Sequence, residues 1–221
     1  MAIEAIAFDA DGTLYPDYQM YLRSIPFFLL HSRLVRHFGK VRRRIRAIRP
    51  IDDFYALQAE LLAAELRIPA ARASELIDRH IYGTWEGLFR RVTAYPSLRG
   101  LLEELKGEGF RLAVLSDLPV ERKLRYLRLE GLWDCAFTCE EIGYLKPNPE
   151  PFLALADRLR LPPERIMYVG NNYRYDVVGA SEVGMKTAHL SRRQAPGSRA
   201  DLTFASYAQF RRSLLNYVEH F

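Results

Sequence analysis

The stretch Ile3-Glu4-Ala5-Ile6-Ala7-Phe8-Asp9-Ala10-Asp11-Gly12-Thr13 decides the fold. Its apolar first half is typical of a central strand that is buried on both faces of a sheet. The strand runs into Asp9 and Asp11, which project to the same side of an extended chain because they lie two positions apart. Two acids at one strand end need a compensating charge, and Mg²⁺ supplies it in phosphoryl-transfer sites. An ordinary strand followed by an Asp-Gly turn has the same pattern.

Three later segments each place a polar group at a strand end or in a loop. The groups are Ser116 after the apolar strand 111–115, Lys146 before a proline, and Asn171 and Asp176 after the apolar strand 165–169. Taken singly, each has an ordinary explanation, such as a helix cap for Ser116 or a first-turn charge for Asp176. Together they add a hydroxyl, an ammonium and a second acidic loop to the first two carboxylates.

From residue 111 onward, short apolar strands alternate with helical segments. We expect strands at 111–116, 135–139, 166–169 and 186–190, with an edge strand at 202–204. This alternation predicts an α/β fold with a doubly wound parallel sheet. Ligands on such sheets bind beyond the carboxyl ends of the strands. Asp9, Ser116 and the loop 170–172 all follow strand ends, so the fold and the motifs point to the same place.

The stretch from residue 16 to residue 94 breaks this alternation, because it has helical periodicity throughout and little strand signal. We expect helices at 20–28, 32–48, 53–66, 70–82 and 85–91. The sequence therefore predicts two domains. Residues 1–15 and 95–221 form the α/β core, and residues 16–94 form an inserted all-helical domain.

The ordered set of motifs resembles the haloacid dehalogenase-like (HAD) hydrolase superfamily. The motifs are Asp9-x-Asp11-Gly12-Thr13, the strand-terminal Ser116, Lys146-Pro147, and the acidic loop from Gly170 to Asp176. Four spaced motifs make a chance match improbable, and the resemblance spans residue 3 to about residue 190. It implies a Rossmann-like core with a helical cap that closes over the site. One position departs from the family pattern, because Asn171 stands where the family usually has Asp.

The resemblance implies an Mg²⁺-dependent phosphatase of a small phosphorylated metabolite. Asp9 would be the nucleophile that forms an aspartyl-phosphate, and Asp11 the general acid and base. The implied sets are catalytic Asp9, Asp11 and Lys146; substrate-binding Thr13, Ser116, Asp117 and Lys146; and metal-binding Asp9, Asp11 through its backbone carbonyl, Asn171 and Asp176. Since Asn171 carries no charge, we expect a modest affinity for Mg²⁺.

Two other functions remain open at this stage. A phosphomutase of the same superfamily would share both acids, because it too must protonate and deprotonate an oxygen. A non-catalytic relative would keep the fold and use a basic cap to bind an acidic partner. Dehalogenases and phosphonatases of the superfamily lack an acid at the position of Asp11, so this residue favours phosphate-ester chemistry.

The net charge of +5 is concentrated in residues 33–49, which are rich in arginine. In the same segment Leu34, Phe38, Val41 and Ile45 recur at helical spacing, which predicts one core face and one basic face toward solvent. Some of these arginines would alternatively attract a phosphorylated substrate. Nucleic-acid binding is disfavoured, because no aromatic interleaving or known motif accompanies the charge.

Composition and hydropathy predict a cytoplasmic protein. We find no apolar run of the ~18 residues that a membrane span needs, and Glu4 and Asp9 interrupt the N-terminal apolar stretch. Cys135 and Cys139 predict neither a disulfide nor a metal site. The substrate and the oligomeric state are not predictable. Candidates for specificity, by position only, are Tyr15, Tyr18, Tyr21, Arg23 and Trp85, and packing or surface roles suit each of them better.

Overall fold

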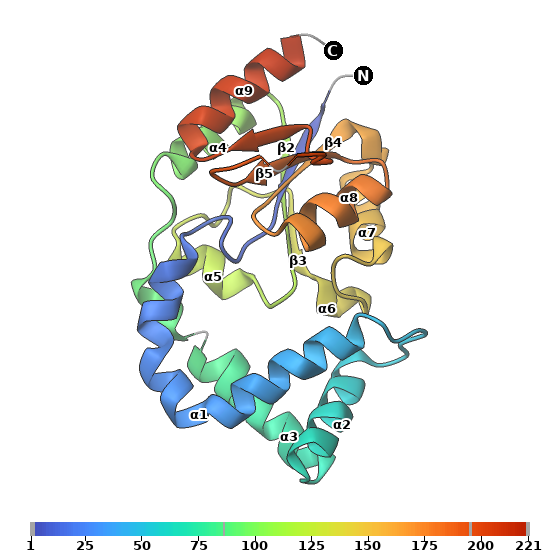
Figure 1. Ribbon diagram of the computed structural model, residues 1–221. Coiled ribbons are helices and arrows are strands. Elements are labelled where there is room, and N and C mark those ends of the chain that lie inside the picture. The colour runs from blue at the N-terminus through green and yellow to red at the C-terminus, as the bar shows by residue number, and fades with distance from the viewer. Residues whose placement is uncertain (1–2, 86, 195, 220–221) are drawn as a thin grey trace.

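A six-stranded parallel sheet forms the centre of the part of the chain that the structure describes (Figure 1). The structure is a computed structural model and describes residues 3–85, 87–194 and 196–219. The strand order is β3-β2-β1-β4-β5-β6. The strands are β1 (Ala5–Phe8), β2 (Arg111–Ser116), β3 (Cys135–Thr138), β4 (Ile166–Gly170), β5 (Lys186–Leu190) and β6 (Leu202–Phe204). The predicted doubly wound sheet is confirmed, including its short edge strand.

Strand β1 lies at the middle of the sheet and is buried on both faces, as its uninterrupted apolar sequence predicts. Ile6 and Phe8 face one apolar cluster, whereas Ala5 and Ala7 face the other. Helices α4 (Leu98–Gly107), α5 (Glu121–Tyr126) and α9 (Tyr207–Glu219) contribute to the first cluster. Helices α6 (Cys139–Ile142), α7 (Pro149–Leu159) and α8 (Gly179–Glu182) contribute to the second. The sheet is thus covered by helices on both sides.

The chain between β1 and β2 is helical, as predicted. Before α4 it comprises α1 (Asp17–Ile45), α2 (Phe54–Leu66), α3 (Ala70–Leu76), the π-helix η1 (Ile77–Trp85) and the 3₁₀ helix η2 (Leu88–Arg91). We call residues 17–91 the helical segment. Figure 1 shows it beyond the carboxyl ends of the strands, where a cap over a site would lie. Its status as a separate domain stays a prediction.

Helix α1 consists of two helical parts that meet at a kink at His31, where the backbone is not helical (φ −118°, ψ 24°). The kink lies between the two helices predicted at 20–28 and 32–48, although the observed helix begins at Asp17 and ends at Ile45. Leu34 and Val41 are buried as predicted. The prediction that the basic residues face solvent is wrong for Arg42, which is only 7% exposed and pairs with Glu140 of α6. The reason is that this part of α1 lies against the core, so that Arg42 faces the interface between α1 and α6.

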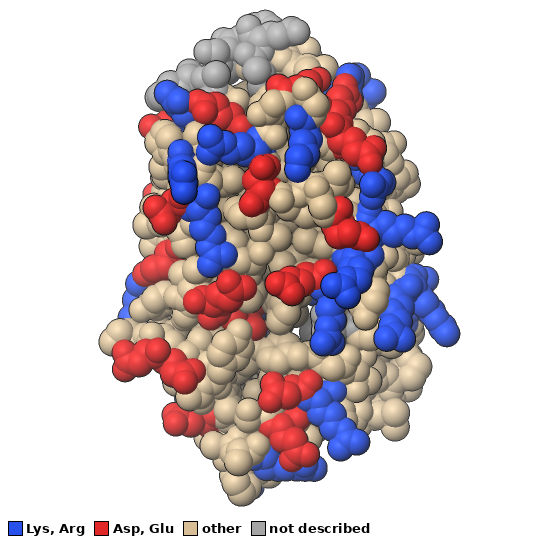
Figure 2. Space-filling view, turned by 180° about the vertical axis from the view of Figure 1, so that it is seen from behind, with Lys and Arg blue, Asp and Glu red and all other residues tan. Residues whose placement is uncertain are grey.

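Charges of both signs cover the surface. The face shown in Figure 2 intersperses acidic and basic side chains, with one group of basic side chains on the right flank. Among the described residues, no helix is both long enough and apolar enough to cross a membrane. Cys135 and Cys139 are both free thiols, in line with the prediction that they form no disulfide.

Candidate active site

The site lies where the strand order reverses, at the carboxyl ends of β1, β2 and β4. The Asp9 N–H donates to the Val169 carbonyl at 2.9 Å, which keeps the end of β1 beside β4. Ser116 ends β2 on the other side of β1, and Gly170 ends β4. The chain then turns at residue 10, because the N–H groups of Thr13 and Leu14 both donate to the Ala10 carbonyl.

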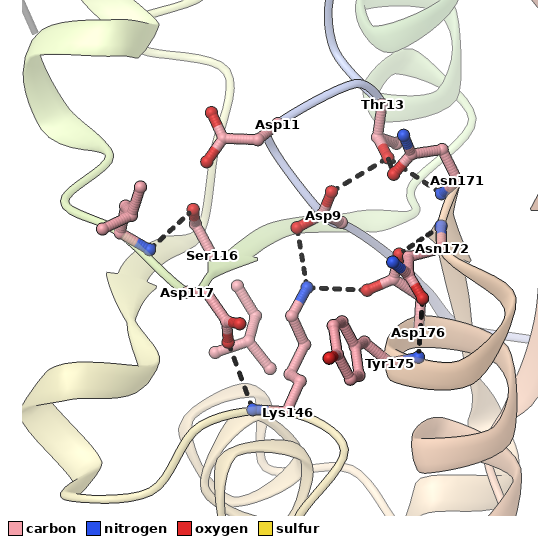
Figure 3. A network of polar contacts seen from close by, with 12 residues as sticks. Asp9, Asp11, Thr13, Ser116, Asp117, Lys146, Asn171, Asn172, Tyr175 and Asp176 are labelled. Atoms are coloured by element: carbon pink, nitrogen blue, oxygen red, sulfur yellow. Dashed lines mark hydrogen bonds and ion pairs between the residues drawn. The ribbon is translucent and has the colours of Figure 1, made fainter. Parts of the chain in front are cut away.

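Lys146 is the centre of the site (Figure 3). Its Nζ lies 2.6 Å from Asp9 Oδ1, 2.7 Å from Asp176 Oδ1 and 3.0 Å from the Tyr168 hydroxyl. The side chain is buried. Burial alone would lower the pKa of Lys146, but the charges of Asp176 and Asp9 outweigh it and raise the pKa well above its usual value. The ammonium is therefore a permanent charge between two carboxylates.

Asp9 accepts a second hydrogen bond from the neighbouring turn. The Thr13 hydroxyl donates to Asp9 Oδ2 at 3.0 Å and itself accepts from the Asn171 N–H at 3.1 Å. Burial raises the pKa of Asp9 to about 7, and the negative charges of Asp176 and Asp11 add to this, while Lys146 acts in the opposite direction. Asp9 is thus fixed in place, and the effect of its burial on the pKa outweighs the attraction of Lys146.

Asp11 faces different partners from Asp9, contrary to the expectation that the two side chains project alike. Lys123 Nζ lies 2.7 Å from both Asp11 oxygens, and the Tyr15 hydroxyl donates to Asp11 Oδ1 at 2.6 Å. Figure 3 shows the Asp11 carboxylate pointing away from Lys146. The physical reason is the turn at residue 10, which ends the extended geometry on which the expectation rests.

Lys123 was missed by sequence reasoning, although a signal exists. The residue is 3% exposed and lies on α5. Helical spacing places it on the same face as Val120, Leu124 and Leu127, which are all buried. A lysine on an otherwise apolar helix face indicates a buried charge that needs a carboxylate partner.

The acidic loop contacts a further carboxylate that the sequence did not indicate. Asn171 Nδ2 donates to Asp17 Oδ2 at 3.2 Å, and Asp17 is the first residue of α1. Gly12, with a φ of +83°, allows this approach, because a Cβ there would lie 2.1 Å from Asn171 Nδ2 and 2.5 Å from Asp17 Oδ1. Asp17 therefore places a negative charge beside the amide that replaces the family's usual acid. On the other side of the loop, the Asn172 N–H donates to Asp176 Oδ2 at 2.9 Å.

Ser116 and Asp117 were both predicted to bind substrate, and those roles stay predictions. The Ser116 hydroxyl is buried and accepts from the Leu118 N–H at 3.3 Å. Asp117 accepts from the Lys146 N–H at 3.1 Å and pairs with Arg46 of α1. Burial acts to raise the pKa of Asp117, but the charges of Lys146 and Arg46 lower it overall. Asp117 thus joins three segments of the chain around the site.

The five specificity candidates have different positions. Tyr21 lines the pocket that contains Asp9 and Lys146, and Tyr15 holds Asp11. Tyr18 is exposed, and Arg23 donates to the Gln19 carbonyl. The side chain of Trp85 lies outside the described part of the structure.

The chemistry of the pocket fits a hard divalent cation. Its carboxylates belong to Asp9, Asp11, Asp17, Asp117 and Asp176, and Asn171 adds an amide oxygen. Asp11 pairs with Lys123 and Asp117 with Arg46. The remaining three carboxylates against Lys146 leave two surplus negative charges. Carboxylate, amide and carbonyl oxygens are the ligands that Mg²⁺ prefers. No group of three or more His, Cys, Asp or Glu side chains in the described residues is already arranged to hold a metal ion. The Lys146 ammonium lies between Asp9 and Asp176.

The relatives found by comparison with known proteins include a pyrophosphatase and a sugar-phosphate phosphatase. The chain is 25% identical over 194 residues to the pyrophosphatase PpaX of Bacillus cereus, covering 86% of this chain and 84% of the relative. It is 30% identical over 205 residues to the glyceraldehyde 3-phosphate phosphatase of Methanopyrus kandleri, with 86% and 84% covered.

Solved structures share the fold. A 2-haloacid dehalogenase from Pseudomonas syringae superposes with a TM-score of 0.71 at 22% identity, covering 97% of this chain and 99% of that one. A HAD phosphatase from Thermococcus onnurineus gives a TM-score of 0.62 at 22% identity, with 96% and 98% covered. The family model of the haloacid dehalogenase-like hydrolases matches residues 3–184, a range that includes all four motifs. The chain therefore belongs to the haloacid dehalogenase-like hydrolases.

Proposed function

We propose that the chain is an Mg²⁺-dependent phosphatase that hydrolyses a small phosphorylated metabolite through an aspartyl-phosphate on Asp9. The observation that carries this proposal is the ion-paired set of Asp9, Lys146 and Asp176, which lines one pocket together with Asp11. A nucleophilic carboxylate, a fixed cation and a second acid are what an in-line phosphoryl transfer requires.

In the first half-reaction a carboxylate oxygen of Asp9 attacks phosphorus, and the bond from phosphorus to the leaving oxygen breaks. Asp11 donates a proton to that oxygen, so that an alcohol leaves instead of an alkoxide. Lys146 lies 2.6 Å from the nucleophile and offsets the charge of the phosphoryl oxygens. Thr13 orients Asp9 through its hydroxyl group.

In the second half-reaction Asp11 takes a proton from water while the water oxygen attacks phosphorus. The bond from phosphorus to the Asp9 oxygen breaks, inorganic phosphate leaves and the free carboxylate returns. Lys123 and Tyr15 hold Asp11 in one position during both halves. This anchoring supports a role for Asp11 as the proton carrier, because a base must lie at a fixed distance from the water it activates.

Asp9, Asp176, the Asn171 amide oxygen and the Asp11 backbone carbonyl would hold the Mg²⁺ ion. When bound, the ion neutralises the surplus negative charge of the pocket and that of the phosphoryl group. Asp17 would act through Asn171, which it contacts. The charge balance of the pocket supports this assignment.

The phosphatase assignment also has support from the relatives, since the two compared above are named for phosphate release. The dehalogenase neighbours, at 22% identity or less, share the fold. Asp11 distinguishes the two chemistries, because a departing halide needs no proton whereas an alkoxide does.

The test is the release of inorganic phosphate from para-nitrophenyl phosphate, with Mg²⁺ and with a chelator present. We expect release only with Mg²⁺, and we expect Asp9→Asn to abolish it while the circular dichroism spectrum stays native. Asp157→Asn, at an exposed position of α7, is the matched control and keeps full activity. Turnover by Asp9→Asn would refute the nucleophile. Isomerisation of a sugar phosphate without phosphate release would instead identify a phosphomutase.

A further inference from the structure

The first half of α1 exposes a group of large apolar side chains to solvent. Figure 1 shows this part of the helix, in blue, along one edge of the molecule. Tyr55 and Leu153 are the only other large apolar side chains that are exposed in the described residues, so the exposed apolar surface is concentrated on one helix. The side chains of this group are between 50% and 81% exposed, and they belong to Tyr18, Tyr21, Leu22, Ile25, Leu29 and Leu30.

Four of these side chains form a row along one face of the helix. We call this row the α1 seam, and it consists of Tyr18, Leu22, Ile25 and Leu29. Successive members are four, three and four positions apart, which is the spacing with which one helix packs along another. The opposite face of the same turns is already covered, because Met20 and Phe27 are buried against the rest of the chain. Apolar residues on both faces are typical of a buried helix, so we expect the α1 seam to be covered by a partner.

We propose that the α1 seam is the contact face of a homodimer, in which α1 of one copy packs antiparallel against α1 of a second copy across a twofold axis. The spacing of the seam is the same when it is read from either end. A twofold axis through its middle therefore places Tyr18 of each copy opposite Leu29 of the other, and Leu22 opposite Ile25. Such self-complementarity is what a twofold interface between identical chains requires.

The size of the exposed surface fits such a dimer. An interface of standard size buries roughly 800 Å² on each partner. The six exposed side chains supply on the order of 700 Å², since a fully covered aromatic side chain buries roughly 150–250 Å². The largest apolar patch of a monomeric protein is usually smaller, at roughly 300–600 Å². The apolar surface on the first half of α1 therefore reaches the scale of a dimer interface.

The charges around the α1 seam favour a protein partner over a membrane. A helix that lies on a membrane surface carries lysine and arginine along the polar flanks of its apolar face. Between residues 17 and 30 the only basic residue is Arg23, and its guanidinium donates to the Gln19 carbonyl of the same helix at 2.9 Å. The arginine-rich part of α1 begins after the kink at His31. Because the seam carries no charge, a second seam covers it without burying an unpaired ion.

Sedimentation equilibrium tests the dimer. We expect the native chain to have twice the 25.6 kDa mass of one chain. Leu22→Glu/Ile25→Glu places like charges opposite each other at the centre of the seam, so the dissociation constant of its dimer should rise at least about a hundredfold. Leu153→Glu, at a half-exposed position of α7, is the matched control and leaves the dimer intact. Tyr21 stays unchanged in every variant, because it lines the active-site pocket.

A second variant tests the direction of the pairing. Leu22→Glu/Ile25→Lys places a glutamate opposite a lysine in an antiparallel dimer, whereas parallel helices would place like charges opposite each other. We expect it to dimerise at least about tenfold more tightly than Leu22→Glu/Ile25→Glu, and both should keep a native circular dichroism spectrum because the two positions are exposed.

Three results would overturn the proposal. The first is a native chain that stays monomeric, whether or not it binds vesicles of phosphatidylcholine and phosphatidylserine. The second is a dimer that survives Leu22→Glu/Ile25→Glu in a folded protein. The third is equal or weaker dimerisation of Leu22→Glu/Ile25→Lys, which would contradict the antiparallel arrangement.

Discussion

At the scale of single residues, the site is defined by an imbalance of charge. The buried ammonium of Lys146 faces the carboxylates of Asp9 and Asp176, and Asp17 lies nearby across Asn171. One cation cannot neutralise three anions. Burial raises the pKa of Asp9 to about 7 and raises the pKa of Asp17 above its usual value, and neighbouring carboxylates add to both shifts.

This imbalance predicts a pH-dependent stability of the metal-free protein. Because folding raises the pKa of Asp9 to about 7, the folded state loses stability as the pH rises through that value. Between about pH 5 and about pH 8 the free energy of unfolding in a chelator should fall by roughly 3 kcal/mol more for the native chain than for Asp9→Asn. Urea denaturation at both pH values measures the difference. An equal fall in both proteins would contradict the raised pKa of Asp9.

The pairing of Asn171 with Asp17 leads to a prediction about the proposed Mg²⁺ site. Asp17→Asn should weaken Mg²⁺ binding about tenfold, because it removes a charge that acts through Asn171. Asn171→Asp should instead strengthen binding and lower the Mg²⁺ concentration for half-maximal rate. Calorimetric titration with Mg²⁺ measures the affinity directly.

Exchanging the two residues provides the control. The double variant Asp17→Asn/Asn171→Asp keeps the charge of the pocket and should bind Mg²⁺ at least as tightly as the native chain. Unaltered affinity in Asp17→Asn would show that Asp17 has no influence on the metal, and activity without metal dependence would refute the metal site itself.

At the scale of elements, Asp117 connects the loop after β2 to two other segments. It accepts from the backbone of Lys146 and pairs with Arg46 on α1, while Arg46 also donates to the Lys146 carbonyl at 2.7 Å. The loop that presents Lys146 is thus fixed by a residue next to Ser116. This arrangement gives Asp117 a structural role that its position in the sequence did not reveal.

The lowered pKa of Asp117 gives this role a pH signature. A carboxyl group whose pKa falls on folding adds stability above its unfolded pKa, and this contribution is lost as the pH falls through the folded value. Asp117→Asn should therefore cost about 2 kcal/mol at about pH 7 and clearly less at about pH 2, which lies below the unfolded pKa of about 3.9. Urea denaturation across this range measures both limits, and a cost that is independent of pH would show that the ion pair contributes nothing.

Sequence periodicity was sufficient to predict the helices and strands, but it was not sufficient to predict the side-chain contacts between them. The strands of the sheet were predictable because an apolar run that ends in a polar residue has few alternatives. The partners of Asp11 were not, because Lys123 and Tyr15 reach it only after the turn at residue 10 and the packing of α5. Arg42 was assigned to solvent because its interface with Glu140 joins positions 98 residues apart. Local pattern contains no information on such pairs.

At the scale of the whole molecule, the helical segment and the sheet share one apolar cluster. That cluster contains Phe38 and Val41 of α1 as well as Leu115 of β2 and Phe152 of α7. The buried pair of Arg42 and Glu140 crosses the same interface, and Gln58 of α2 accepts from Arg42 at 3.0 Å. The two parts are therefore joined by both apolar and ionic contacts.

This shared interface predicts that the chain unfolds as one unit. Arg42→Met should lower the free energy of unfolding by about 3 kcal/mol or more, because Glu140 would remain buried without its cation. Arg43→Met, one residue along and exposed, should change it by less than about 0.5 kcal/mol. Differential scanning calorimetry should show a single transition for the native chain and for both variants, with the lowest midpoint for Arg42→Met. Two separate transitions in the native chain would show that the helical segment unfolds independently of the sheet. Equal midpoints for the two variants would show that Arg42 does not hold the helical segment to the sheet.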